Sequence, residues 1–332
     1  MSGKAVEKAV YLGTFAHSKS LKELEIAHDA AIFVDESGKI VAVASGVADE
    51  ARAREVLPQA ELDREPGEAD PDHQRGRLRH HLRPRRHLLA DHVLDLAQHA
   101  LIGRCCMDSL APDYYRDAGP EESIAHTRAT IAHIASIDPT HAIVKPIITP
   151  RFAPSCSSQL LTGLGKLQKE TGLPVQTHIS ENKREIDLVA ELFPESKSYA
   201  EVYDSHGLLG PKTVLAHAVH ITDEERALIK ERGAGISHCP VSNAALSSGM
   251  AAVRTWLDDG INVGLGTDVS GGYSPSVLEA VRQALMCSRN LAMGGGRGGS
   301  GEEEVECGGA VVVADLGGAK VVGMEGKVGA FE

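Results

Sequence analysis

Between residues 88 and 290 the sequence alternates between short apolar runs and longer segments with the period of an α-helix. This alternation limits the fold more than any other feature. Strands are predicted at 101–107, 144–148, 174–179, 214–217, 234–238 and 262–266. Helices are predicted at 88–100, 120–136, 157–170, 183–192, 222–232, 250–259 and 276–290. A capping box of Thr222 and Glu225 opens the helix at 222–232. Strand and helix alternation with short connections is typical of an α/β barrel or a doubly wound sheet.

The chain on either side of this region differs in composition and pattern, which predicts that the whole chain has four parts. Residues 1–62 contain short apolar runs and form the N-terminal part of a small β domain. Residues 63–87 are an irregular basic segment, and residues 88–293 are the α/β domain. Residues 294–332 begin as a linker rich in Gly and Glu. They continue with a strand at 310–314 and a helix at 316–322, which we interpret as the start of a return to the β domain.

The basic segment 63–87 has the period of neither a strand nor a helix, and three interpretations of it remain open. It is a basic arm for nucleic acid, a solvated loop, or a stretch out of frame with what the fold requires there. The net charge of -12 argues against nucleic acid as a partner.

Composition narrows the setting in which the protein works. Apolar runs are shorter than the roughly 18 residues that cross a bilayer, so we expect no membrane partner. The first residues are polar without an apolar signal region, which predicts a cytoplasmic location. The six cysteines show no paired spacing and are interpreted as reduced thiols.

Metal-capable side chains stand at the ends of three predicted strands. His178 and His217 each end an apolar run, and Asp268 follows a third run and two glycines. The carboxyl ends of barrel strands are where such enzymes carry their chemistry, so these residues predict a partial shell for Zn²⁺ or Fe²⁺. Glu181 lies three residues beyond His178, and His238 adds a polar group at another strand end. Taken singly, each of these residues is a weak signal, and His178 alone is better explained as a core histidine.

From about residue 87 to 292 the sequence resembles the guanine deaminases of the metal-dependent amidohydrolase superfamily. The Thr-Pro-Arg-Phe and Gly-Thr-Asp-x-x-Gly-Gly-Tyr stretches are the specific ones, whereas the strand-end His and Asp pattern alone indicates the superfamily. The matching stretches are Arg104-Cys-Cys-Met-Asp108, Lys145-Pro-Ile-Ile-Thr-Pro-Arg-Phe152, His178-Ile-Ser-Glu-Asn182, Ala216-His217, His238-Cys-Pro-Val-Ser-Asn243, Leu246-Ser-Ser-Gly249 and Gly264-Leu-Gly-Thr-Asp-Val-Ser-Gly-Gly-Tyr-Ser274.

The resemblance implies an incomplete TIM-type (β/α)8 metal-dependent hydrolase barrel with a small β-sandwich domain from the chain termini. It implies one zinc ion per chain, with iron as an alternative, and a homodimer. The implied reaction is hydrolytic deamination of guanine to xanthine and ammonia by a metal-activated water.

Residue roles follow from the same resemblance. The metal ligands are His178, His217 and Asp268. The catalytic residues are Glu181 as proton shuttle, Asp268 and His238. Guanine is contacted by Arg151 and Phe152 and, at the reacting end, by His178, Glu181 and Asp268.

The sequence departs from the family pattern in one segment. The family places a His-x-His pair of metal ligands after a Pro-Gly and a short strand. Here Pro66-Gly67 is followed by Glu-Ala-Asp-Pro-Asp-His73 without such a pair. Family strands are also expected beyond residue 332. Two alternatives therefore stay open: a non-catalytic or unstable remnant of a guanine deaminase, and another amidohydrolase of the S-adenosylhomocysteine or chlorohydrolase type.

Overall fold

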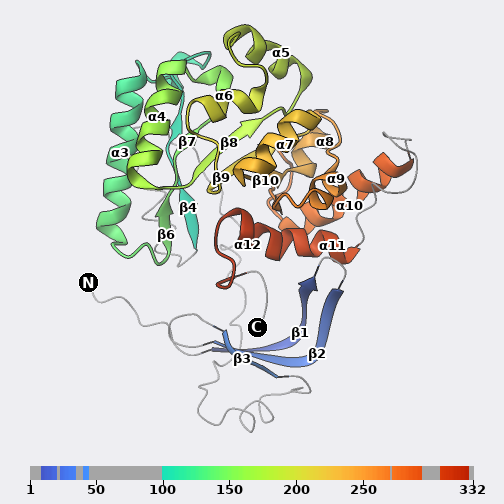
Figure 1. Cartoon of the computed structure of the whole chain (residues 1–332). Helices are drawn as coiled ribbons and strands as arrows, with labels where there is room; N and C mark the ends of the chain where they lie inside the picture. The colour runs from blue at the N-terminus through green and yellow to red at the C-terminus, as the bar shows by residue number, and fades with distance from the viewer. Residues whose placement is uncertain are drawn as a thin grey trace. The chain divides into compact units, whose positions relative to one another are not determined.

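The computed structural model describes the backbone of residues 9–20, 23–34, 40–44, 99–269, 271–293 and 307–328. The chain divides into two compact units, Met1–Arg83 with Ala330–Glu332 and Pro84–Gly329, and each is described by itself (Figure 1). The segment 63–87 and most of the helix predicted at 88–100 lie outside the described residues. The predicted domain limits at 62/63 and 87/88 fall there too and stay predictions.

The first unit contains an antiparallel sheet of three strands in chain order. These are β1 (Ala9–Ser20), β2 (Glu23–Val34) and β3 (Ile40–Ala44). Tyr11 pairs with Ile32, and Phe33 pairs with Ala42. The short apolar runs at 11–15 and 30–34 lie within β1 and β2, so the β-rich character of this part is confirmed.

The second unit is built on parallel strands. β8 (Val175–Ile179), β9 (Thr213–His217), β10 (Gly235–His238) and β11 (Val263–Leu265) form one sheet in the order β11-β10-β9-β8. β4 (Ala100–Ile102) pairs with β6 (Val144–Pro146), and β5 (Cys105–Cys106) pairs with β7 (Thr149–Pro150). A parallel bridge between Ile148 and Val175 joins these pairs to β8.

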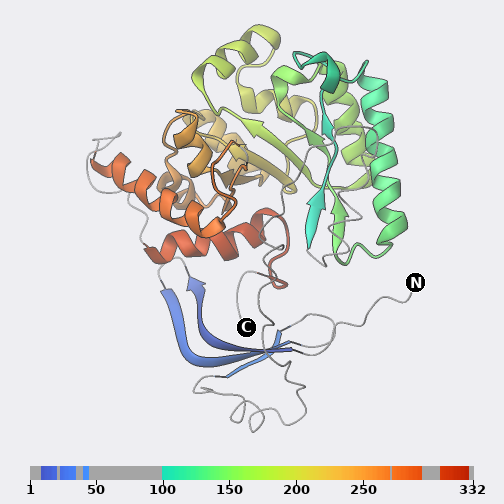
Figure 2. The same cartoon turned by 180° about the vertical axis from the view of Figure 1, so that it is seen from behind.

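Helices connect successive strands, as in barrels of the TIM type. Figures 1 and 2 show them around the strands of this unit. The longer helices are α3 (Pro120–Ile137), α4 (Ser158–Thr171), α5 (Lys183–Leu192), α7 (Asp223–Arg232) and α10 (Val277–Met293). The shorter helices are η2 (Asp113–Tyr115), η3 (Ala153–Ser155), α6 (Tyr199–Ser205), α8 (Pro240–Ala245), α9 (Val253–Asp258), α11 (Cys307–Val312), η4 (Val313–Gly317) and α12 (Gly318–Val321).

Strand alternation separates the core from the face that carries the site. In β8, Val175, Thr177 and Ile179 are buried, and the intervening Gln176 and His178 are half-buried on the opposite face. The buried face belongs to the main apolar core, together with Leu164 of α4 and Ile229 of α7. His178 is thereby turned away from the core, at the carboxyl end of its strand.

Most strands and helices predicted for residues 101–290 are confirmed, with limits shifted by a few residues. The short helices α6 and α8 were not predicted. No described helix is both long enough and apolar enough to cross a membrane.

The strand predicted at 310–314 is wrong, because these residues lie in α11 and η4. A short apolar run does not by itself distinguish a buried helix from a strand. Glycines allow this helical segment to lie close to β11. A Cβ atom on Gly317 would stand 2.1 Å from the Val263 carbonyl oxygen, and one on Gly264 would stand 2.9 Å from Gly318 Cα. The described part of the C-terminal region therefore packs as helix on the second unit.

The capping box at the start of α7 is confirmed and does more than cap one helix. Glu225 Oε2 accepts a hydrogen bond from the Thr222 backbone N–H at 2.9 Å. Its Oε1 accepts from the Ala200 backbone N–H in α6 at 3.0 Å. The side chain is buried, so one carboxylate joins α6 to α7.

Replacing Glu225 with Ala should lower the free energy of unfolding by about 2–3 kcal/mol, because two N–H groups lose their acceptor in a buried place. Urea denaturation followed by circular dichroism measures the change. Glu224→Ala, at the exposed neighbouring position, is the control and should change stability by less than about 0.5 kcal/mol. Equal effects of the two substitutions would contradict the role of the Glu225 carboxylate.

Candidate metal and active site

Three strand ends bring His178, His217 and Asp268 together. One ligand atom of each residue lies within 4.8 Å of the corresponding atoms of the other two. The two imidazole rings are stacked, with centroids 5.1 Å apart and an angle of 27° between the planes. Two imidazoles and one carboxylate at this spacing form a donor set suited to Zn²⁺ or Fe²⁺.

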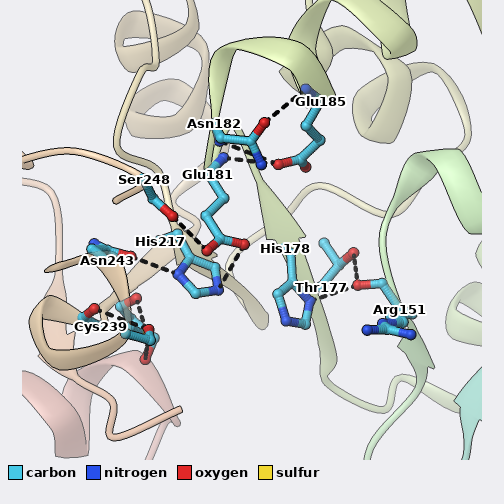
Figure 3. A network of polar contacts seen from close by, with 12 residues as sticks. Arg151, Thr177, His178, Glu181, Asn182, Glu185, His217, Cys239, Asn243 and Ser248 are labelled. Atoms are coloured by element: carbon cyan, nitrogen blue, oxygen red, sulfur yellow. Dashed lines mark hydrogen bonds and ion pairs between the residues drawn. The ribbon is translucent and has the colours of Figure 1, made fainter. Parts of the chain in front are cut away.

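Hydrogen bonds orient both imidazoles toward this point (Figure 3). His178 Nδ1 lies 2.7 Å from the Arg151 carbonyl oxygen, and His217 Nδ1 lies 2.9 Å from Asn243 Oδ1. Oxygens of carbonyl groups only accept, so each Nδ1 carries the hydrogen. The Nε2 lone pair of each ring is then available to a cation, as in metal sites where an outer group fixes the tautomer.

The backbone is strained where the strands end. His217, Ala218, Ser180 and Asp268 have φ values of 71°, 52°, 48° and 45°, in the left-handed region that non-glycine residues rarely adopt. They are four of the seven such non-glycine residues in the described part of the chain. Strain of this kind costs about 1–3 kcal/mol per residue and gathers at functional sites.

Glu181 lies in the loop after β8 and reaches the same point. Its Oε2 is 3.7 Å from His217 Nε2, and its Oε1 accepts a hydrogen bond of 2.9 Å from Ser248 Oγ (Figure 3). His220 Nε2 donates to the Ser248 carbonyl at 2.7 Å and holds the loop that carries this serine. A carboxylate held in this way can accept a proton beside the candidate metal position.

His238 ends β10 and is completely buried. Burial, and then the neighbouring His217, lower its pKa to about 3, so its ring is neutral at ordinary pH. Neither ring nitrogen has a hydrogen-bond partner among the described residues. The His238 and Trp256 rings are nearly perpendicular, with centroids 6.3 Å apart. Burial and His217 also lower the pKa of His178. Neutral imidazoles are the form that binds a metal, and an unpaired buried imidazole fits a site whose polar ligand is not part of the chain.

Arg151 and Phe152 follow β7, on the neighbouring part of the unit. The Arg151 guanidinium carbon lies 5.6 Å from the centre of the Phe152 ring, and its Nη1 donates to Met107 Sδ at 3.5 Å. The Phe152 ring meets the His178 ring edge-on, with centroids 6.5 Å apart. An aromatic face and a cation therefore lie next to a candidate metal ligand.

Sequence reasoning did not single out Asn243, Ser248 or His220 for a role. Asn243 and Ser248 occur in stretches that match the family, but neither shows a periodic or compositional signal. Their partners are 26 and 67 residues away along the chain. These contacts form only when strands distant in sequence pair.

Parallel strands with metal-capable side chains at their carboxyl ends are the arrangement found in barrel-type metal-dependent hydrolases. The amidohydrolase family profile matches residues 79–332, and the chain belongs to this family. Proteins named as guanine deaminases are among the relatives that it resembles in sequence. The chain is 52% identical to the Schizosaccharomyces pombe protein named "Probable guanine deaminase", over 74% of this chain and 46% of that protein. It is 41% identical to the guanine deaminase of Homo sapiens, over 74% of this chain and 53% of that protein.

The fold is also similar to that of a guanine deaminase of known structure. The guanine deaminase of C. acetobutylicum with guanine bound in its active site superposes with a TM-score of 0.78 at 30% identity, over 98% of this chain and 88% of that one. The chain spans about half the length of the curated relatives it matches.

Removing the acceptor that orients His217 tests the candidate metal site. Asn243→Ala should weaken zinc binding by about 10–100-fold, because the His217 ring loses the hydrogen bond that fixes its tautomer. Competition with a chromophoric chelator measures the zinc dissociation constant. Asn262→Ala, at an exposed position before β11, is the control and should leave it unchanged. Unchanged zinc affinity in Asn243→Ala would contradict the role of Asn243 in orienting His217 for a metal.

Proposed function

We propose that this chain is a zinc-dependent guanine deaminase that hydrolyses guanine to xanthine and ammonia. The observation that carries the proposal is the convergence of His178, His217 and Asp268, with Glu181 beside them. The similarity to guanine deaminases at 41% and 52% identity supports the choice of substrate. It does not favour the remnant or chlorohydrolase alternatives. A homodimer and a cytoplasmic location stay predictions.

In this proposal His178 Nε2, His217 Nε2 and the Asp268 carboxylate hold one zinc ion, and iron is the alternative. When bound, such a cation lowers the pKa of water and supplies a nucleophile at neutral pH.

Glu181 takes one proton from the attacking water and delivers it to a ring nitrogen, and it then moves the second proton, from the newly added hydroxyl group, to the departing amine. Ser248 keeps one oxygen of this carboxylate in place, which leaves the other oxygen facing His217. Asp268 lies close to the two imidazoles. In this proposal its carboxylate shares with Glu181 the proton that the water loses at the start of the reaction. His238, which is neutral and buried, orients the reacting groups and does not supply a proton near neutral pH.

Arg151 and Phe152 supply the selectivity for guanine. The Phe152 ring stacks on the purine, and the guanidinium donates to the 6-oxo group. A 6-amino group offers no acceptor at this position, so adenine leaves the donor unpaired.

The Glu181 carboxylate is tested by Glu181→Gln in the zinc-loaded chain. We expect the kcat for guanine to fall by about 10²–10⁴-fold, because the amide cannot carry the proton. Loss of guanine is followed by its ultraviolet absorbance, and zinc content per chain should stay as in the parent protein. A parent chain that binds zinc but does not convert guanine would refute the proposed function.

Arg151→Ala tests substrate selectivity. Arg151 is exposed in the structure, and a bound purine would cover its guanidinium. A donor left unpaired under the purine costs about 1–3 kcal/mol, so the parent protein should prefer guanine over adenine by at least about tenfold in kcat/KM. The substitution should raise KM for guanine and narrow that ratio. Arg128→Ala, which removes an exposed ion pair with Glu170 on the helical surface, is the control. Equal turnover of adenine and guanine by the parent would contradict the role of Arg151.

A further inference from the structure

Helix α6 carries a tyrosine whose hydroxyl reaches the ends of two site strands. Tyr203 is completely buried. Its hydroxyl accepts hydrogen bonds from the Ala153 backbone N–H and from Thr177 Oγ1, both at 3.0 Å, and donates to the His178 carbonyl at 2.7 Å. A phenol hydroxyl has one donor and two acceptor positions, so its hydrogen-bonding capacity is fully used.

The groups it joins belong to two different parts of the site. Ala153 directly follows Arg151 and Phe152 at the end of β7, whereas Thr177 and His178 end β8. The two strand ends meet again at the Arg151 carbonyl, which accepts from the backbone N–H of His178 at 3.2 Å and from its Nδ1 at 2.7 Å. The position of Arg151 and the orientation of the His178 ring are therefore coupled.

Regular strand pairing cannot hold this junction. Among the described residues, the chain segment that leads into β7 pairs with β8 through one bridge, between Ile148 and Val175. The Gln176 N–H donates to the Ile148 carbonyl. The next N–H on the same side of β8, that of His178, donates to the Arg151 carbonyl, so the β7 segment has one extra residue. Such a bulge redirects side chains and interrupts the ladder. Pro150, within the bulge, has no N–H to contribute.

We propose that Tyr203 is a positioning residue for this site. Its hydroxyl fixes the spacing between the purine-contacting pair Arg151–Phe152 and the metal ligand His178. The inference rests on the proposed function for the roles of those residues. Without the hydroxyl, the Ala153 N–H and the His178 carbonyl lose a buried partner, and the hydrogen bonds that His178 makes to the Arg151 carbonyl hold the two strand ends with less support.

Tyr203→Phe is the direct test, because it removes only the hydroxyl and keeps the ring that packs 5.5 Å from the Tyr199 ring. We expect the zinc dissociation constant to rise about tenfold, since the His178 ring is less well fixed. We expect kcat/KM for guanine to fall by about 10–100-fold, mostly through KM, since the purine contacts shift relative to the metal. Zinc competition and steady-state kinetics measure the two effects separately.

Thr213→Val is the matched control. Thr213 is also buried, and its hydroxyl also joins backbone groups, accepting from Gly210 N–H at 3.0 Å and donating to the Leu208 carbonyl at 2.7 Å. It stands at the first residue of β9, whereas His217 ends that strand. Thermal unfolding should show a similar loss of stability for the two variants, while Thr213→Val keeps the parent zinc affinity and KM.

The outcomes separate this inference from the proposed function. Parent values of zinc affinity and KM in Tyr203→Phe would overturn the positioning role. If the parent chain binds zinc without converting guanine, the proposed function fails and the zinc comparison still decides the role of Tyr203. A parent chain that binds no zinc overturns both. Should Tyr203→Phe not fold, Thr177→Val must show the same changes to a smaller extent. It removes one donor to the same hydroxyl and also the 3.3 Å contact of the Thr177 hydroxyl with the Arg151 carbonyl. Parent values in that variant would then overturn the role.

Discussion

Parallel pairing of neighbouring strands is the constraint on which the site depends. Ile179 pairs with His217, and His238 pairs with Leu265, so β8, β9, β10 and β11 run in one direction and end at one edge. Residues that are far apart in the sequence are thereby brought to a common point. The outward face of the same strands is buried against helices, which keeps the register because a slip of one residue would turn His178 into the apolar core.

The edge is held by hydrogen bonds that offset its strained backbone. Ala218, in the left-handed region, donates its N–H to the Ile179 carbonyl at 3.0 Å, and His220 donates to the Ser180 carbonyl at 3.0 Å. Side-chain hydrogen bonds between separate elements also join Asn243 to His217, Ser248 to Glu181 and the Tyr203 hydroxyl to the His178 carbonyl. His178, His217 and Glu181 therefore each have a partner on another element, which limits their movement before substrate binds.

Burial sets the charge of the site. Burial lowers the pKa values of His178 and His238 and favours neutral rings, so neither ring adds a positive charge near Glu181 and Asp268. A site with neutral imidazoles beside carboxyl groups suits a divalent cation, and the cation in turn relieves the cost of burying those groups.

Local sequence patterns determined much of the fold and part of the site. The periods of 2 and 3.6 predict the strands and helices between residues 101 and 290, and Thr222 with Glu225 predicts the start of α7, because these signals involve neighbours within one or two turns. The strand-end positions of His178, His217 and Asp268 are visible for the same reason.

The tertiary structure alone decided the rest. The run at 310–314 became helix because glycines let it approach β11 closely, and the amphipathic pattern of six or seven residues in α6 and α8 is too short to predict them. Asn243, Ser248 and Tyr203 act on groups from 25 to 67 residues away along the chain. Those partners are chosen by strand pairing and helix packing, which bring together residues that no local period connects.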